Sequence, residues 1–531
     1  MNIIPPLLIM IMRYVMALDA GTGSGRCVIF DEHGKQVAVS QQEWTHKSDP
    51  RFPGSMEFEV DTNWKILSSC IRETLHSAGI AAEEIVGISA TSMREGIVLY
   101  DAAGKEIWAC ANVDSRAAQE VIELTHREEG LEERIYTLSG QTFSLGAIPR
   151  LLWVKKHLPE VYDKTRTVNM LSDWVLYKLS GERVADPSNG CTTGLFDLHT
   201  RQWKPEIARW CALRDDIFPP VYESGTVIGN VHPAAAEETG LHPGTPVIIS
   251  GGDAQLGSVG VNAVRPGQCC VFGGSFWQQE VNMDAVQVDP HARIRVNCHS
   301  VPNLWQMEGI SFFPGLVARW FRDTFCQAEL RMADATGIDA YTLLERQSAQ
   351  VPAGAYGIVC TFSDVMNYIR WKHAAPSFIN LDISSPEKSG KAALFRAIQE
   401  NAAYVSYGNL QAIASNTGAF PDEVIFAGGA SKGSLWCQIV TDVFGVPVKV
   451  PEVREASALG SALCAAVGAG IFSSIEEASQ NAVRWEQFYE PNLNDHHVYQ
   501  EEFERWHAVY KQHMELVNAK VTTPMWSAPG V

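Results

Sequence analysis

The sequence lacks the marks of several common protein classes. Its twelve cysteines are scattered, with no C-x-x-C pair and no spacing typical of zinc ligands. Several stand in apolar stretches, among them Cys27, Cys269, Cys270 and Cys464, as buried reduced thiols do in cytoplasmic proteins. No uninterrupted apolar run reaches the roughly 18 residues that a membrane span needs. We therefore expect a cytoplasmic protein that holds no structural zinc and does not cross a membrane.

Positive charge is also scarce. The chain has 42 Lys and Arg against 61 Asp and Glu, a formal net charge of −19. Because nucleic acids and anionic membranes are bound through clustered Lys and Arg, this balance argues against both as partners. A local cationic pocket for one small phosphate is still compatible with it. The motif G-x-x-x-x-G-K-[ST] is absent, so a P-loop fold is not expected.

The first residues, MNIIPPLLIMIMRYV, are apolar enough to suggest a signal peptide. They lack a basic segment, Pro5 and Pro6 interrupt the apolar run, and no small-residue cleavage site precedes the first strand. We interpret residues 1–13 as a disordered extension, with a start at Met12 as an alternative.

The chain does contain a long alternation of strand-like and helix-like segments. With 531 residues, of which 46 % are hydrophobic and 19 % charged, it is expected to form two or more domains with sizeable cores. Strands are predicted over residues 85–93 and 96–104, and helices over 115–136, 149–164 and 434–444. Alternation of this kind is typical of the α/β class.

A weak internal repeat divides the chain. YVMALDAGTGSGRCVIF (residues 14–30) reads as strand, glycine turn and strand, and GQCCVFGGSFWQQEVN (267–282) repeats that order. PVIISGGDAQLGSVG (246–260) and EVIFAGGASKGSLWCQIVTDVFG (423–445) each read as strand, glycine corner and helix. A domain boundary near residue 262 gives two halves that each open with a glycine hairpin. Two facing hairpins could grip one polyphosphate.

The first glycine turn is a candidate anion site. Backbone N–H groups of Gly21, Thr22 and Gly23 can form a nest, and glycine permits the positive φ that a nest needs. Asp19 would repel a bare phosphate, but it fits a hydrated Mg²⁺ placed between carboxylate and phosphate. The alternative is an ordinary hairpin turn with a capping Asp.

Charged residues at strand ends are candidate catalytic and substrate-binding groups. Asp253 follows an apolar strand beside an expected helix start, so it could act as general base for a hydroxyl, or it could only cap the helix. Arg94 and Glu95 leave another strand, and Asp114 and Arg116 follow in the next loop. These pairs could bind the hydroxyls or carbonyls of a polar ligand, or could be solvated ion pairs.

A competing motif lies near the end of the chain. Residues 429–433, GASKG, match the G-x-S-x-G pattern of the α/β-hydrolase nucleophile elbow, with Ser431 as the nucleophile. No HGGG-type segment precedes it, and a hydrolase leaves Asp19 and Asp253 without a role. The histidines available downstream for a triad are His496, His497, His507 and His513.

Together these segments resemble the FGGY family of carbohydrate kinases, which phosphorylate a hydroxyl of a sugar or polyol from ATP. The resemblance covers the chain from about Tyr14 onward. ALDAGTGSGR resembles the first phosphate loop, PGSMEFEVDTNW the segment with an acidic residue and a tryptophan (Glu57 and Trp64), and SMREGIVLYD the substrate loop. GGDAQLG resembles the catalytic corner, and GISFFPGLVARWFRD and AGGASKGSLWCQIVTDVFGVPV resemble the C-terminal signatures.

The resemblance implies two ribonuclease H-like domains of the actin-like ATPase fold, with ATP in an interdomain cleft and Mg²⁺ beside it. Residues 14–262 would form the N-terminal domain with the substrate site and the base, and residues 263–531 the nucleotide-binding domain. An actin-like ATPase without an acceptor shares this fold and is an alternative. The implied roles are general base for Asp253, metal binding for Asp19, acceptor binding for Arg94, Glu95 and Asp114, and nucleotide binding for Gly21, Thr22, Gly23, Arg26, Gly273, Gly274, Ser275, Gly428, Gly429 and Lys432.

Within the family, the chain most resembles members that act on open-chain (S)-4,5-dihydroxypentane-2,3-dione, a quorum-sensing signal. The segments that carry this resemblance are SMREGIVLY, IWACANVDSRAA, GGSFWQQ, HAAPSFINL and RWFRD. The implied reaction phosphorylates its terminal hydroxyl, with xylulose, ribulose and glycerol as alternative acceptors. A monomer or homodimer is expected, and the resemblance implies a regulatory contact with a sugar phosphotransferase-system protein such as HPr. Two positions depart from the family pattern: Arg150 stands where Lys is usual, and Gly433 where glycerol kinases carry an Asn near the adenine.

Overall fold

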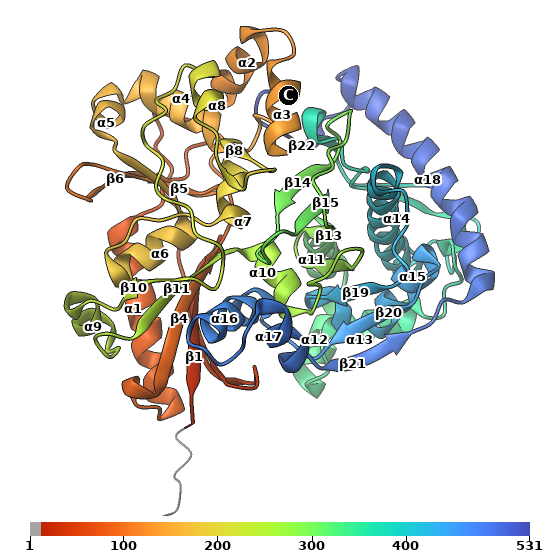
Figure 1. Ribbon diagram of the computed structural model, residues 1–531. Coiled ribbons are helices and arrows are strands. Elements are labelled where there is room, and N and C mark those ends of the chain that lie inside the picture. The colour runs from red at the N-terminus through yellow and green to blue at the C-terminus, as the bar shows by residue number, and fades with distance from the viewer. Residues whose placement is uncertain (1–11) are drawn as a thin grey trace, which may run out of the picture.

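The computed structural model describes residues 12–531, so all but the end of the predicted extension over residues 1–13 lies outside the described residues. The chain forms two α/β lobes, each built around one large mixed sheet, and most of the second half of the chain lies in the lobe on the right of Figure 1. The predicted α/β class is confirmed.

The first sheet consists of six strands, in the order β10 (Val227–Asn230), β11 (Pro246–Gly252), β4 (Ile85–Ser92), β1 (Tyr14–Ala20), β2 (Ser24–Asp31) and β3 (Gln36–Glu43). β1, β4 and β11 run parallel, and β1, β2 and β3 form an antiparallel meander. The central strand β1 is buried along most of its length, as its continuous apolar run predicts, whereas the edge strand β3 has no buried residue.

Helices cover both faces of this sheet. One face packs around Leu18, Ile88 and Trp174 with α1 (Val60–Ala78), α6 (Leu171–Ser180) and α9 (Pro233–Thr239). The other face packs around Val15 and Ile248 with α10 (Asp253–Gly260), α16 (Ala456–Gly468) and α17 (Ile475–Ala482). The sheet is therefore the middle layer of three.

α10 and α16 cross at glycines. A Cβ on Gly260 would stand 2.0 Å from the carbonyl oxygen of Ala456, and one on Gly460 would stand 1.9 Å from that of Leu256. Only glycine permits this approach. Because α16 and α17 come from beyond the predicted boundary near residue 262, residues 456–482 return to the first sheet, and the exact division into domains stays a prediction.

The second sheet consists of seven strands, in the order β14 (Arg295–Cys298), β15 (Trp305–Ser311), β13 (Trp277–Met283), β12 (Cys269–Gly273), β19 (Val424–Ala427), β20 (Val448–Pro451) and β21 (Trp485–Tyr489). β12 pairs antiparallel with β13 and parallel with β19, just as β1 pairs with β2 and β4. The internal repeat seen in the sequence is thus a repeat of strand order.

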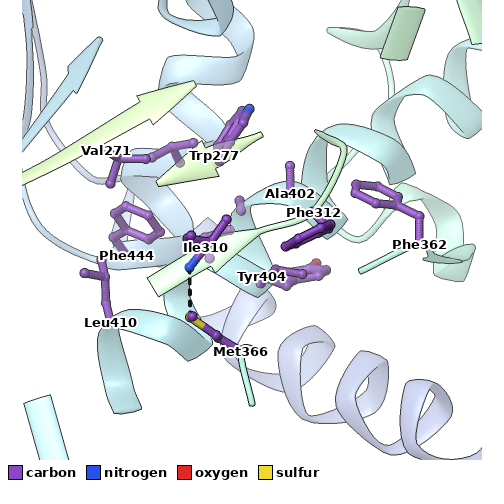
Figure 2. Close-up of a cluster of buried hydrophobic side chains, with 14 of the residues drawn as sticks. Val271, Trp277, Ile310, Phe312, Phe362, Met366, Ala402, Tyr404, Leu410 and Phe444 are labelled. Carbon is purple, nitrogen blue, oxygen red and sulfur yellow. Dashed lines mark hydrogen bonds between the residues drawn. The ribbon is translucent and has the colours of Figure 1, made fainter. Parts of the chain in front are cut away.

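The core of the second lobe lies between this sheet and the long helix α14 (Lys391–Thr417). Figure 2 shows Ala402, Tyr404 and Leu410 of α14 among the side chains of the sheet, with the Ile310 amide donating to the sulfur of Met366 at 3.3 Å. This packing holds the strands whose ends carry the second glycine hairpin.

The remaining elements surround the two sheets. The smaller strands are β5 (Ile97–Tyr100), β6 (Glu106–Cys110), β7 (Thr167–Met170), β8 (Phe196–Asp197), β9 (Gln202–Trp203), β16 (Val359–Thr361), β17 (Lys372–Ala374), β18 (Ser377–Ile379) and β22 (Pro524–Ser527). The other helices are α2 (Ala118–Arg127), α3 (Leu131–Ser139), α4 (Ala147–His157), α5 (Pro159–Lys164), α7 (Pro187–Gly190), α8 (Pro205–Trp210), α11 (Pro314–Phe325), α12 (Gln327–Thr336), α13 (Ala340–Ser348), α15 (Ser434–Phe444) and α18 (Leu493–Asn518).

The predicted elements are found, with two interruptions. The helix predicted over residues 115–136 is broken at Gly130, which has a φ of 75°, and the one over 149–164 is broken before Pro159. All twelve cysteines are buried and free of disulfides, as predicted. No helix within residues 12–531 combines the length and the apolar character that crossing a membrane requires.

Candidate active site

Three charged side chains stand where neighbouring parallel strands of the first sheet end. Asp19 is the last residue but one of β1, and Asp253 directly follows β11. Arg94 comes two residues after β4, the strand that lies between the other two. Because ligands of α/β sheets bind at the carboxyl ends of the strands, this edge is the candidate active site.

The first glycine hairpin differs from the predicted nest. The N–H of Gly21 donates to the carbonyl of Ser24 at 3.0 Å, and neither Gly21 nor Gly23 has a positive φ. The prediction of a positive-φ nest is therefore wrong here, because the pairing of β1 with β2 closes the turn without it. Within residues 12–531 the amides of Thr22 and Gly23 donate to no protein group. These two amides, rather than three, can face a phosphate.

Asp19 has the surroundings of a metal-binding carboxylate. Burial raises its pKa to about 7; Arg26, whose Nη1 lies 3.6 Å away, opposes the rise, and the charges of Asp253 and Glu455 add to it. Arg26 also pairs with Glu455. No group of three or more His, Cys, Asp or Glu side chains in the described part of the chain could cage a metal ion. A single carboxylate suits Mg²⁺, which keeps most of its waters, so the donor set fits that ion.

Asp253 does not cap α10, as one of the two predicted roles required: the cap is Gly252, without a side-chain hydrogen bond. Asp253 begins α10, and its Oδ1 accepts a hydrogen bond from the Ala254 amide at 2.8 Å and lies 3.6 Å from Nε of Arg94. No group among residues 12–531 donates to Oδ2, and 39 % of the side chain is exposed. Desolvation raises its pKa to about 6, although Arg94 opposes that rise. One carboxylate oxygen is therefore available to take a proton near neutral pH.

Arg94 and Glu95 are each held by a residue of the second sheet. Both terminal nitrogens of Arg94 donate to the carboxylate of Glu308, each at 2.6 Å. Nη2 of Arg295 lies 2.5 Å from the carboxylate of Glu95. Burial alone would raise the pKa of Glu308, but Arg94 holds it below its usual value. The two lobes thus share one buried ion-pair cluster at the site.

Glu308 and Arg295 were not among the predicted site residues. They are 0 % and 2 % exposed, in strands that are otherwise largely apolar. A charged residue in the middle of a buried strand needs a partner, and this was the available signal.

Arg150 joins the two predicted substrate loops. Its guanidinium donates to the backbone carbonyls of Glu95, Asn112 and Asp114, the latter two at 2.7 and 3.0 Å. Glu95 has a left-handed φ of 62°, a conformation that costs a non-glycine residue free energy and persists only when its surroundings hold it. Arg150 is therefore placed to fix the loop that carries the Arg94–Glu95 pair.

Of the other predicted residues, the Asp114 carboxylate is bonded to Arg116 alone within residues 12–531. It is fully buried, bonded to Arg116 at 2.6 Å and to the Met56 amide at 2.7 Å. Within residues 12–531 it forms no ion pair with Arg94. Its carbonyl, held by Arg150, is the group that links it to the site.

The second hairpin packs closely against the other glycine segment. β12 and β19 are parallel neighbours, so Gly273 and Gly428 lie at the same edge of the sheet. Gly428 has a φ of 94°, and a Cβ there would stand 3.0 Å from the backbone of Gly273. On the other side, a Cβ on Gly315 at the start of α11 would stand 2.3 Å from the carbonyl oxygen of Gly274. The hairpin is held on both sides by backbone.

A cavity of about 470 Å³ opens beside this hairpin, a size that suits a small-molecule ligand. Five residues predicted to bind nucleotide line it, whereas Gly428 and the four residues of the first hairpin (Gly21, Thr22, Gly23 and Arg26) do not. The sequence did not predict that α13 lines the cavity, because no motif in that helix indicates a ligand-binding role. The lining residues are Gly273, Gly274, Ser275, Gly315, Ala318, Arg319, Asp339, Tyr341, Thr342, Glu345, Phe395, Gly429, Ala430, Lys432, Gly433 and Trp436.

Ser431 does not have the surroundings of a hydrolase nucleophile. Its hydroxyl donates to the carbonyl of Gly428 at 2.9 Å. Of the downstream histidines, His496 bonds to the carbonyl of Asp442 and His513 to Thr361, and in the described part of the chain none bonds to Ser431. Ser431 is therefore in no Ser–His pair within residues 12–531.

Comparison with known proteins agrees with this geometry. Residues 14–260 match the profile of the N-terminal domain of the FGGY family of carbohydrate kinases, and residues 284–469 match that of its C-terminal domain. The chain is 54 % identical over 520 residues to the autoinducer-2 kinase of Salmonella paratyphi B, covering 98 % of both chains. It is 53 % identical over 519 residues to that of Escherichia coli K12, again covering 98 % of both. The crystal structure of xylulose kinase from Rhodospirillum rubrum superposes with a TM-score of 0.82 at 25 % identity, covering 95 % of this chain and 100 % of that one.

Proposed function

The chain belongs to the FGGY family of carbohydrate kinases, and we propose that it phosphorylates open-chain autoinducer-2, (S)-4,5-dihydroxypentane-2,3-dione, on its terminal hydroxyl with ATP. The high identity to autoinducer-2 kinases over nearly the whole chain supports this acceptor. The observation that carries the chemistry is the position of Asp253, whose Oδ1 lies 3.6 Å from Nε of Arg94 and whose charge acts on Asp19 at the same edge of the first sheet.

Asp253 is the general base of the proposed reaction. Its Oδ2 accepts the proton of the acceptor hydroxyl as that oxygen attacks the γ-phosphorus of ATP, and ADP leaves as the bond from the γ-phosphorus to the bridging oxygen breaks. With a pKa of about 6, the carboxylate is mostly ionised at neutral pH yet basic enough to take the proton. Arg94 stays charged beside it, because its own pKa is raised well above the usual value, chiefly by Glu308 acting against burial.

Arg94 and Glu95 bind the acceptor in this proposal. Each terminal nitrogen of Arg94 carries a second N–H beyond the one given to Glu308, and these can donate to a carbonyl or hydroxyl oxygen of the acceptor. Glu95 can accept from a hydroxyl. Asp114 contributes through its carbonyl, which Arg150 ties to the same loop. Holding the acceptor in one orientation aligns the attacking oxygen with the bond that breaks.

The two glycine hairpins and Asp19 bind the nucleotide and its metal. Asp19 would hold Mg²⁺ through water, and the ion would supply charge neutralisation at the phosphates. The amides of Thr22 and Gly23 and of the second hairpin stabilise phosphate oxygens. The groups proposed along the nucleotide are Gly21, Thr22, Gly23, Arg26, Gly273, Gly274, Ser275, Gly428, Gly429 and Lys432.

An assay of ADP release over a panel of acceptors tests the acceptor. Dihydroxypentanedione, xylulose, ribulose and glycerol are each titrated with ATP and Mg²⁺. The highest kcat/KM is expected for dihydroxypentanedione. A higher value for xylulose or ribulose would replace the proposed acceptor with a pentulose, and ATP hydrolysis that no acceptor accelerates would favour an ATPase. The cytoplasmic location, the monomeric or dimeric state and the contact with HPr stay predictions.

A further inference from the structure

A fully buried hydroxyl holds the backbone just before the proposed base. Ser188 belongs to the short helix α7, and its Oγ accepts a hydrogen bond from the Gly252 amide at 3.2 Å, one residue before Asp253. The same Oγ donates to Oδ1 of Asp186 at 2.5 Å and accepts from Oγ of Ser300 at 3.2 Å. A hydroxyl has one proton to donate and two lone pairs that accept. The whole hydrogen-bonding capacity of Ser188 is therefore used at this place.

The end of β11 is shaped for this hydroxyl. A Cβ on Gly251 would stand 2.0 Å from Oγ of Ser188, so any other residue there would displace the serine. Gln255 occupies the helix position from which a side chain often reaches back to the amide of the N-cap residue, which is Gly252 in α10. In the described part of the chain, neither amide atom of Gln255 has a hydrogen-bond partner. The Gly252 amide is thus held by a group from outside its own helix.

The backbone of Asp253 is held on its other side as well. Its carbonyl accepts a hydrogen bond from Oγ of Ser457, in α16, at 2.7 Å. The carboxylate is held more loosely, since Oδ1 accepts from the adjacent Ala254 amide and lies 3.6 Å from Nε of Arg94. Because no donor among residues 12–531 fixes Oδ2, its direction follows from the backbone that carries it. A displaced backbone would therefore displace the atom that takes the proton.

We propose that Ser188 is a positioning residue for the phosphoryl transfer, because its hydroxyl fixes the Gly252 amide and so aims Oδ2 of Asp253 at the acceptor hydroxyl. This inference rests on the proposed function, since it takes Asp253 to be the base. Ser188 acts through the backbone and touches neither acceptor nor nucleotide. Ser300, which donates to it, lies between β14 and β15 of the second sheet. The position of the base therefore also depends on the second lobe.

A double-mutant cycle with Ser188→Ala and Asp253→Asn tests the proposal. With Asp253 present, Ser188→Ala should lower kcat at least about tenfold, because a shift of about 1 Å in a reacting group can cost about 100-fold, while both KM values stay constant. In the Asp253→Asn background the same change should leave the residual turnover as it is, because no base remains to be positioned. An unchanged kcat with Asp253 present would overturn the proposal. Equal falls in both backgrounds would overturn it too, because they would show that Ser188 only stabilises the fold.

Ser224→Ala is the matched control. The Ser224 hydroxyl is also buried and donates to the carbonyl of Ser250, in the same strand, at 2.6 Å. Its loss should lower the melting temperature about as much as Ser188→Ala does, but should leave kcat as it is. Both variants should bind ADP like wild type, because neither serine lines the 470 Å³ cavity. A comparable fall of kcat in Ser224→Ala would overturn the specific role of Ser188.

A milder variant keeps the test decisive if Ser188→Ala is poorly folded. Ser300→Ala removes one partner of the Ser188 hydroxyl and leaves the Gly252 amide its acceptor, so kcat should fall about threefold, and only when Asp253 is present. An unchanged kcat in this variant would overturn the proposal. Failure of the proposed function looks different, because Asp253→Asn alone would then turn over at the wild-type rate, or no acceptor would be phosphorylated.

Discussion

Replacing Asp253 by Asn removes the proposed base with little change in shape. We expect turnover to fall at least about 100-fold, the usual contribution of a positioned general base, which corresponds to about 2.7 kcal/mol of transition-state stabilisation. Since the pKa of Asp253 is about 6, its ionised fraction falls from about nine-tenths at pH 7 to about one-tenth at pH 5. The wild-type kcat/KM for the acceptor should therefore fall about tenfold over that range, and the small residual rate of the variant should lack this fall.

The assay must separate Asp253 from Asp19, whose pKa of about 7 lies close by. Mg²⁺ competes with the proton on Asp19, so an ionisation that shifts with Mg²⁺ concentration belongs to Asp19. The pH series is therefore run at two saturating Mg²⁺ concentrations, and the ionisation that stays in place is assigned to Asp253. Asp364→Asn is the matched control, because burial also raises the pKa of Asp364 to about 6, and its neighbours Val365 and His507 belong to the second lobe. Its pH profile should equal that of wild type.

Folding of the Asp253→Asn variant is checked by thermal melting and ADP binding. The folded pKa of Asp253 lies above its ordinary value of 3.8, so ionisation of this group destabilises the fold progressively as pH rises from about 4 to about 6. At pH 7 the neutral Asn should therefore melt at the wild-type temperature or above. A correctly folded variant that turns over at close to the wild-type rate would refute the assignment of the base.

Two further predictions concern the groups that hold the acceptor loop. Glu308→Gln leaves Arg94 without its buried counter-charge, so the free energy of unfolding measured by urea denaturation should fall by about 3 kcal/mol. An unchanged urea midpoint would contradict the buried pair. Arg150→Lys replaces a planar guanidinium that reaches three carbonyls by a single ammonium, so the acceptor KM should rise about tenfold while the KM for ATP stays constant. Equal rises in both constants would indicate a general packing role.

The strands and hairpins of the site were predictable because local pattern determines them. The apolar runs that end at Asp19 and Asp253 are long enough to be buried strands. Because such strands pair in parallel, the charged residues at their carboxyl ends meet at one edge of the sheet. The glycines also predicted the positions of the turns. The φ angles of these glycines were not predictable, because hairpin pairing rather than a nest closes the first turn.

The partners across the lobes were not predictable from the sequence. Arg94 and Glu308 are 214 positions apart, and no local pattern links a strand exit to the middle of β15. The hydrogen bond from the Trp436 amide to Glu345 depends on Gly433 lying against α13, and no local pattern predicts that contact. α16 is apolar on nearly all sides, which indicates burial but not which of the two sheets it covers.

The return of α16 and α17 to the first sheet has a consequence for how the protein is made. During translation, the strands that contain Val15 and Ile248 leave the ribosome long before residues 456–482, which cover one of their faces. Until then the apolar side chains of that face stay exposed to solvent. The N-terminal half on its own would therefore be an aggregation-prone fragment and not a complete domain. Truncated products that end near residue 262 should thus be substrates for chaperones, because the first lobe is complete only when residues 456–482 cover that face.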